Sequence, residues 1–454
     1  MKRRRFLQLA ASAAAGAVAG HSSAFSSSAQ YSLRIAPVSV ELAPGIAVRT
    51  TGYNGQSPGP VLRMREGVAA TVSVTNASEV PELVHWHGLH LSSAASGVRE
   101  EGGPMIPPGA TRTYRFTPSP SGTRWYHAHT GAFTDLQRAA NSGQFGFLLV
   151  EPRSHAGAFD QEVFLAVHHW EPSLVRERSA AREAAYRYAS FNDKVLGAGE
   201  PVRVRAGERV LFHFLNASPT EDVLLHLPRH RFTVVALDGN PVPKHAAADV
   251  LSLAVGERID AIVEMNTPGK WLLGSVDAAE RARGLGVCVE YANQNGTARW
   301  HPPVALDWSY ARFSATGHST PEPDRLLEML LEKRLDSPGG IDHWLMNGRS
   351  NPDIEPLFLQ QGRRYRLRMM NATARVHPVH LHHHSFELTR INQIPVSGIF
   401  KDTIRLDRYN VVEADVAVSH LGPALYHSPQ RLVMDSGYPM KSSWTDGMSH
   451  ENAC

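Results

Sequence analysis

Paired histidines are the feature of this 454-residue chain most suited to chemistry. Three intact clusters and one broken cluster are His85-Trp86-His87, His127-Ala128-His129, His377-Pro378-Val379-His380-Leu381-His382 and His427-Ser428-Pro429. In an extended strand, residues i and i+2 point to the same face, so each His-x-His pair presents two imidazoles side by side. Neutral imidazole suits Cu, Zn, Fe and Ni, and Cu²⁺ ranks highest among the divalent ions. The pairs predict metal ions held against the rim of a sheet.

A threefold internal repeat must position these clusters. Each copy runs from a glycine turn through an alternating strand to an asparagine nine residues later, and the three pairs are Gly67 and Asn76, Gly207 and Asn216, and Gly362 and Asn371. Repetition at this long spacing indicates three similar β-sandwich domains rather than a short-period solenoid.

The same repeat aligns the histidines of the outer copies. Each of three glycines lies five residues before a matched position, and the pairs are Gly122 and His127, Gly269 and Gly274, and Gly422 and His427. His85, His226 and His380 follow the three asparagines by nine or ten residues. The middle copy keeps one histidine at these four positions, so we expect it to bind no metal. Ligands from the first and third domains meet only if those domains touch, which predicts a cluster at their interface.

Domain boundaries follow from the repeat. We predict a first domain over 31–153, a metal-poor spacer over 154–310, a linker over 311–324 and a third domain over 325–454. The Ala/Arg/Glu-rich stretch from Ser173 to Ser190 predicts a helix. Leu326 to Leu335 also has helical propensity, but it falls where a domain's first strand belongs, so the repeat favours a strand there.

Residues 1–30 have the features of a targeting segment. Arg3-Arg4-Arg5-Phe6-Leu7 precedes an Ala/Gly-rich stretch from Leu9 to Gly20, which resembles a twin-arginine export signal. That route carries folded proteins, which suits a chain that loads a cofactor before export. We expect a periplasmic or secreted protein with no membrane span after the signal is removed.

Composition excludes several classes of protein. The formal net charge is +3, and Lys2 with Arg3, Arg4 and Arg5 supplies four positive charges, so the charge is otherwise balanced. This balance argues against a nucleic-acid-binding surface. Cys288 and Cys454 are the only cysteines, which excludes a disulfide framework and a cysteine-rich metal site.

The chain resembles the multicopper oxidases, the laccase-like family of three cupredoxin domains. The resemblance covers essentially the whole mature chain and rests on the histidine clusters together with the flanking segments Tyr53-Asn54-Gly55-Gln56-Ser57-Pro58-Gly59-Pro60 and Trp125-Tyr126. It implies an all-β chain of three consecutive cupredoxin-like Greek-key β-sandwich domains. It also implies a trinuclear copper cluster that reduces O₂ to water, and a type 1 copper that takes electrons from a reducing substrate.

Carried over residue by residue, the resemblance assigns eight metal ligands. His85 and His380 would hold the type 2 copper, and His377 matches the first type 1 ligand. The type 3 pair would be held by His87, His127, His129, His382 and His427. The resemblance implies eight ligands for the trinuclear cluster, of which seven are present. The eighth position falls on Pro429, whose side chain has no donor atom.

The type 1 site departs from the family pattern. A His₂Cys set is required there, but Ser428 stands where the cysteine belongs, Val433 replaces the second histidine, and Tyr438 lies near the axial position. The resemblance therefore implies type 2 and type 3 copper without type 1 copper. Family members often carry an Asp at the position of Ser96, and the resemblance implies that its carboxylate helps to deliver protons to the cluster. A serine has no carboxylate for this role.

Several aromatic residues have no expected role as metal ligands. Trp86 and Trp125 alternate away from the ligands and are predicted to pack in the core. His168, His169 and His318 are expected at the surface. The remaining histidines near the clusters are interpreted as solvated or as supporting the ligands, and they are His90, His383 and His384.

Four interpretations stay open from the sequence. The family favours an enzyme, a copper oxidase that takes electrons from a small reducing substrate at the open type 3 position. The seven histidines at ligand positions favour a copper-binding or copper-resistance protein without turnover, because an idle scaffold would not need them. A copper-free structural scaffold is the third, although it would not require the retained histidine pairs. The fourth is a C-terminal segment altered relative to an active parent.

Overall fold

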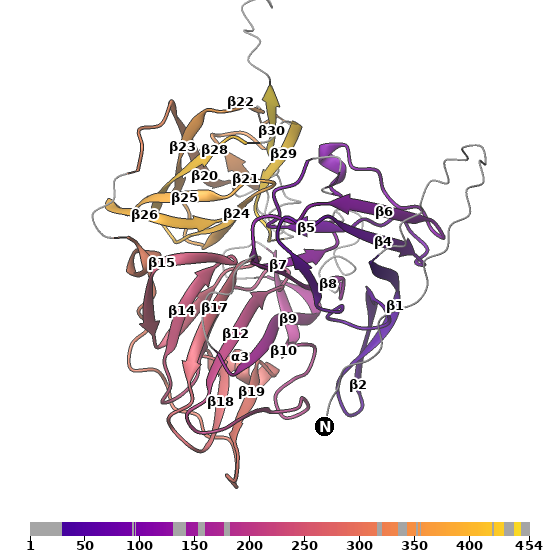
Figure 1. The fold of residues 1–454 in the computed structure, drawn as a ribbon, viewed down its shortest axis with the longest axis vertical. Coiled ribbons are helices and arrows are strands. Elements are labelled where there is room, and N and C mark those ends of the chain that lie inside the picture. The colour runs from indigo at the N-terminus through magenta and orange to yellow at the C-terminus, as the bar shows by residue number, and fades with distance from the viewer. Residues whose placement is uncertain are drawn as a thin grey trace, which may run out of the picture.

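The computed structural model describes residues 30–445 except 93–94, 96, 130–141, 153–158, 177–181, 316–319, 335–342, 351–352, 355, 420–421 and 431–439. The described residues form six β-sheets, one short helix, α3 (Ala278–Arg283), and two 3-10 turns, η1 (Arg99–Glu101) and η2 (Tyr310–Phe313). Figure 1 shows three groups of strands in chain order, coloured indigo to purple, magenta to pink, and orange to yellow. This architecture confirms the predicted fold class of cupredoxin-like β-sandwiches.

The first sandwich consists of two four-stranded sheets, in the orders β2-β1-β4-β6 and β3-β8-β7-β5. Their strands are β1 (Tyr31–Ala43), β2 (Ile46–Tyr53), β3 (Leu62–Arg65), β4 (Ala70–Asn76), β5 (His85–His87), β6 (Thr111–Phe116), β7 (Gly122–His127) and β8 (Phe145–Glu151).

The second sandwich consists of sheets in the orders β10-β9-β12-β17-β14-β15 and β11-β19-β18-β13-β16. Its strands are β9 (Gln161–Arg176), β10 (Arg182–Phe191), β11 (Val202–Val204), β12 (Arg209–Asn216), β13 (Val223–His226), β14 (Phe232–Leu237), β15 (Asn240–Ala248), β16 (Val250–Leu253), β17 (Arg258–Glu264), β18 (Lys270–Ser275) and β19 (Gly286–Tyr291).

The third sandwich repeats the arrangement of the second, with sheets in the orders β21-β20-β23-β28-β25-β26 and β22-β30-β29-β24-β27. Its strands are β20 (Arg325–Arg334), β21 (His343–Met346), β22 (Leu357–Gln360), β23 (Arg364–Asn371), β24 (His377–Leu381), β25 (Phe386–Ile391), β26 (Ile394–Lys401), β27 (Thr403–Leu406), β28 (Val411–Ala417), β29 (Gly422–His427) and β30 (Met440–Thr445).

The three asparagines of the sequence repeat hold the same turn in each sandwich. Each Oδ1 accepts a hydrogen bond from the backbone N–H two residues later, at 2.9 Å for Asn76, 3.0 Å for Asn216 and 3.0 Å for Asn371. Each side-chain amide also donates to one carbonyl oxygen in the turn and to another in a segment distant in sequence. All three asparagines are buried, so an amide that meets its own backbone satisfies groups that water cannot reach.

Strand pairing confirms the alignment of the histidine positions. His85 pairs with His127 between β5 and β7, and His380 pairs with His427 between β24 and β29. At the same place in the second sandwich, His226 pairs with Gly274 between β13 and β18.

Two segments with helical composition form strands. Leu326 to Leu335 was predicted as a strand, which β20 confirms. The helix predicted over Ser173 to Ser190 is wrong, because its described residues belong to β9 and β10, which pair in antiparallel. Propensity is a weak prior, and the start of β9 pairs in parallel with β12, so β9 is fixed in the sheet before it reaches this segment. The domain boundaries stay predictions.

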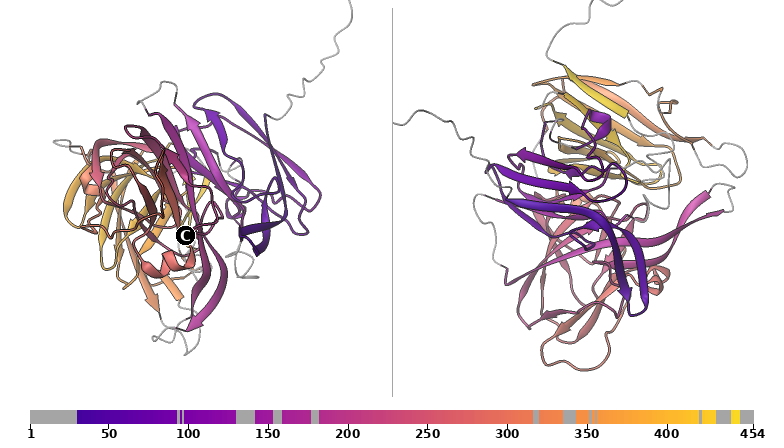
Figure 2. Two further views of the ribbon diagram at one scale, coloured as in Figure 1. Left: turned by 90° about the horizontal axis from the view of Figure 1, so that it is seen from below. Right: turned by 90° about the vertical axis from the view of Figure 1, so that its right-hand side faces the viewer.

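Buried side chains join the sandwiches to one another. Trp86 and Trp125 are buried, as predicted, and Trp125 packs with Phe147 and Leu215, so it joins the first and second sandwiches. Val98 packs on Leu425 and joins the first to the third. Figure 2 shows the first sandwich against both of the others. The histidine-bearing edges of the first and third sandwiches therefore face each other.

Candidate metal centre

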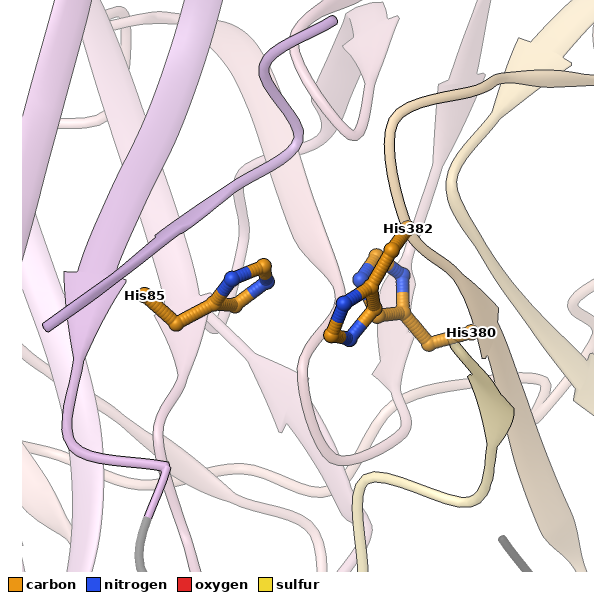
Figure 3. A group of neighbouring side chains, drawn as sticks. All are labelled: His85, His380 and His382. Carbon is orange, nitrogen blue, oxygen red and sulfur yellow. The ribbon is translucent and has the colours of Figure 1, made fainter. Parts of the chain in front are cut away.

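Seven histidines converge where the first and third sandwiches meet. They come from β5, β7 and the residues after it, β24 and the residue after it, and β29, and they are His85, His87, His127, His129, His380, His382 and His427. His127 is half-buried and the other six are buried. Figure 3 shows His85 facing His380 and His382 across the interface. Several sets of three nitrogens lie within 4.8 Å of one another, among them those of His129, His382 and His427.

Hydrogen bonds fix which nitrogen of His382 and His427 carries the proton. His382 donates through Nδ1 to Glu101 Oε1 at 2.7 Å, and His427 donates through Nδ1 to Ser428 O at 2.8 Å. A neutral imidazole has one N–H, so both Nε2 atoms carry lone pairs. These two Nε2 atoms lie 3.0 Å apart. Two lone pairs so close repel each other unless a cation lies between or beside them.

His87 and His127 present a second pair of lone pairs. His87 donates through Nε2 to Asp402 Oδ1 at 3.1 Å, and His127 donates through Nδ1 to Ala128 O at 2.9 Å. The remaining nitrogens, His87 Nδ1 and His127 Nε2, face each other at 3.4 Å. This repeated arrangement fits a metal centre better than a hydrogen-bonded core.

His380 completes the inward-facing set. Its Nδ1 donates to Asp402 O at 2.7 Å, which leaves Nε2 as an acceptor. That Nε2 is buried and has no hydrogen-bond partner among the residues that the structure describes. The His380 ring stacks on His87 at a centroid distance of 3.7 Å.

Burial keeps these rings neutral, which is the form that binds a metal. Burial lowers the pKa of His85, His87 and His382 well below the ordinary value, and the neighbouring imidazoles lower it further because a charge on one ring would repel a charge on the next. Burial also lowers the pKa of His380 to about 4, although Asp402 opposes that shift.

A buried ion network anchored on Asp402 supports the cluster. Arg258 Nη1 donates to Asp402 Oδ1 at 2.7 Å, and Arg124 Nη1 lies 3.6 Å from Asp402 Oδ2. The side chains of all three residues are at most 1% exposed. Burial alone would raise the pKa of Asp402, but the charge of Arg258 and the hydrogen bonds from Arg258 and His87 hold it well below its usual value. Asp402 therefore ties the third sandwich to Arg124 of the first and Arg258 of the second, and it orients His87.

Glu101 is a second buried carboxylate beside the cluster. It lies at the end of η1 and accepts hydrogen bonds from His382 Nδ1, from His383 Nε2 at 2.8 Å and from the backbone N–H of Leu425 at 2.9 Å. A carboxylate on the far nitrogen of a ligating imidazole fixes the tautomer and raises the basicity of the ring. His383 thus supports the site, which agrees with one of the two roles expected for it.

His377 lies apart from the seven. It is 1% exposed, it packs against Trp344 at a centroid distance of 4.2 Å, and neither ring nitrogen has a hydrogen-bond partner among the described residues. Burial, with smaller contributions from Arg375 and Lys333, lowers its pKa to about 3. No group of three potential ligands in the described part of the chain includes His377.

The loop after His427 is described as far as Gln430, and the chain is described again from Met440. Ser428 is fully buried. A methyl group on Gly256 would lie 3.4 Å from Pro429 and 3.7 Å from His87 Cε1, so Pro429 lies near His87 of the cluster. Val433, Tyr438, Ser96 and His318 lie outside the described residues.

The surface positions predicted for His168 and His169 are wrong. They are 2% and 0% exposed, because β9 lies inside a six-stranded sheet. His169 Nε2 bonds Glu280 Oε2 at 2.8 Å.

The comparisons with known proteins agree with this site. Multicopper oxidase family models match residues 34–155, 174–289 and 320–442. Multicopper oxidase MmcO of Mycobacterium tuberculosis is 25% identical over 407 residues, which is 81% of this chain and 77% of that protein. Copper resistance protein A of Escherichia coli is 27% identical over 329 residues, covering 61% of this chain and 52% of that protein.

A solved structure shares the fold. The multi-copper oxidase from Pseudomonas thermotolerans has a TM-score of 0.73 at 24% identity, covering 91% of this chain and 98% of that chain. The chain belongs to the multicopper oxidase family. Membership implies copper as the cofactor and O₂ as a partner. Among the described residues, no helix is long and apolar enough to cross a membrane.

Proposed function

We propose that this chain binds a trinuclear copper cluster through seven histidines and has no type 1 copper. In this proposal His85 and His380 hold the type 2 copper, and the type 3 pair is held by His87, His127, His129, His382 and His427. The observation that carries it is the pairing of inward lone pairs, with His382 Nε2 3.0 Å from His427 Nε2 and His87 Nδ1 3.4 Å from His127 Nε2.

The residues around the cluster supply orientation and exclusion of water. Copper held there supplies redox chemistry toward O₂. Glu101 holds the Nδ1 proton of His382, and Asp402 holds the Nε2 proton of His87, so the opposite nitrogens stay available. The buried walls keep the imidazoles neutral and therefore able to bind Cu²⁺.

Electron entry is where this chain differs from an oxidase with type 1 copper. A serine hydroxyl is much less acidic than a thiol and cannot replace the thiolate that conducts electrons toward the cluster. His377 has no second ligand beside it among the described residues. We propose an oxidoreductase to which a small reducing molecule delivers electrons directly at the type 3 position left open by Pro429.

The second candidate is a copper-binding protein without turnover, which the isolation of His377 favours. One relative carries the name copper resistance protein A. The copper-free scaffold is the weakest candidate, because a scaffold would not require seven converging imidazoles. We further propose that residues 1–30 direct twin-arginine export to the periplasm, and that the domains span 31–153, 154–310 and 325–454.

Copper reconstitution of the full chain tests the proposal. We expect about two to three copper ions per chain, a type 2 signal in electron paramagnetic resonance, near-ultraviolet absorption from a hydroxide-bridged copper pair, and no blue band. Oxygen uptake with small reductants then separates the oxidase from the copper-binding protein. Failure to bind specific copper would overturn both copper candidates.

A further inference from the structure

A small cavity opens beside Pro429. It measures about 50 Å³, and its walls include His127, Gln144, His168 and Pro429. One water molecule requires roughly 10–15 Å³, so the cavity has room for a small molecule. The first, second and third sandwiches all contribute to its lining.

His168 brings an unused acceptor to this cavity. Its Nδ1 donates to Ala217 O at 2.8 Å, so Nε2 carries the lone pair. The ring is 2% exposed, and Nε2 has no hydrogen-bond partner among the described residues. Burying an acceptor without a partner costs free energy of about 1–3 kcal/mol, so this lone pair is suited to a ligand.

Gln144 adds a second acceptor to the same wall. Its Oε1 is buried and has no hydrogen-bond partner in the described part of the chain. His168 and Gln144 both line the cavity, and a ligand that carries hydrogen-bond donors would satisfy acceptors of this kind.

The position of His168 indicates contact with a ligand rather than with a metal ion. Two ligands of one copper ion lie within about 4 Å of each other, since each Cu–N bond is about 2 Å. No group of three potential ligand atoms within 4.8 Å includes His168 among the described residues. A small molecule bound to the copper ion would extend from the ion to His168.

We propose that this cavity binds a small molecule that places a lone pair on copper at the position of Pro429 and donates N–H or O–H to His168. The inference rests on the proposed copper cluster. It identifies the class of molecule that reaches the open position, namely small amines, azoles and hydroxyl compounds with a hydrogen-bond donor opposite the copper-binding atom.

Imidazole is the probe of choice, because its N3 binds copper and its N1–H can donate. The full copper-loaded chain is titrated with imidazole and with 1-methylimidazole, which lacks the donor, and binding is followed by the near-ultraviolet absorption of the copper pair. The variant His168→Phe keeps the stacking on Phe145, which has a centroid distance of 4.7 Å. The control His245→Phe removes an exposed imidazole from β15.

We expect His168→Phe to weaken imidazole binding about five- to tenfold, the size of one net hydrogen bond, and to leave 1-methylimidazole unaffected. His245→Phe should leave both affinities unchanged. If His168→Phe does not fold, Gln144→Leu should weaken imidazole selectively instead. If the wild type, His168→Phe and Gln144→Leu all bind copper and then bind imidazole with equal affinity, this inference is overturned and the proposed cluster stands. A wild type without bound copper would overturn the proposed cluster and this inference together.

Discussion

The histidine cluster and the surroundings of His377 differ although both begin on β24. At the cluster, seven imidazoles from two sandwiches meet, and Asp402 and Glu101 orient two of them. At His377, one buried imidazole stands against Trp344 with no ligand group around it among the described residues. His380 Nε2 and both nitrogens of His377 are equally buried and unpartnered, but only His380 has other imidazoles beside it.

The difference indicates that burial of a histidine is not evidence of a metal site. What distinguishes the cluster is that hydrogen bonds on the outer nitrogens force lone pairs toward one another. Lone pairs that face one another repel unless a cation lies between them, so the cluster is suited to binding metal ions. Among the described residues, no such arrangement surrounds His377.

Acid should destabilise the copper-free protein more than any single substitution. Burial lowers the pKa of His85, His87, His380 and His382 in the folded state, whereas an unfolded histidine titrates near 6.5. The unfolded chain therefore binds more protons below this pH. Each such histidine contributes stability that is present above about pH 6.5 and is lost as the pH falls, at about 1.36 kcal/mol per pH unit.

We expect the free energy of unfolding of the copper-free chain to fall by several kcal/mol between pH 6.5 and 5, as measured by chemical denaturation. His377→Phe should remove only one histidine's share of this slope, because a single imidazole is buried there. A stability that does not change over this pH range would show that the rings take up protons equally in the folded and unfolded chains, which contradicts the account of the cluster.

Asp402→Asn should have the next largest effect. The change leaves Arg258 and Arg124 buried with less opposing charge and takes the carboxylate away from His87, so we expect a loss of about 3–5 kcal/mol in unfolding free energy. Asp407→Asn is the matched control. Asp407 Oδ1 lies 2.7 Å from Arg405 Nε, and the Asp407 side chain is 53% exposed. Loss of this ion pair should lower the free energy of unfolding by less than about 1 kcal/mol. Equal losses in the two variants would rule out a special role for the buried network.

Sequence patterns were sufficient to predict the fold class and the relation between the histidine pairs. The repeat matched His85 with His380 and His127 with His427 as equivalent positions, and the structure pairs the strands at these positions in the same way in both sandwiches. Leu326 to Leu335 could be assigned to a strand from the same repeat, against its propensity. The ends of the segment from Ser173 to Ser190, which lie in β9 and β10, could not, since nothing in the Ala/Arg/Glu composition indicates the neighbouring strand.

The supporting carboxylates lay beyond sequence reasoning. Asp402 is 315 residues from His87, and Glu101 is 281 residues from His382. Neither has a local motif that would mark it, and only the packing of the sandwiches brings each to its histidine. The burial of His168 was missed because the adjacent histidines were interpreted by residue type alone, whereas the apolar run from Val163 to Val167 before them belongs to β9, which lies inside a sheet.

The most direct test of the central claim is a copper count on two matched variants, His382→Phe and His377→Phe, after identical reconstitution. Both replace a buried imidazole of the third sandwich with an aromatic ring, and thermal unfolding checks that both are folded. We predict that His382→Phe loses type 3 copper and its near-ultraviolet absorption, while His377→Phe binds as much copper as the wild type. Equal copper loss in the two variants, or no loss in either, would contradict a cluster retained apart from a lost type 1 site.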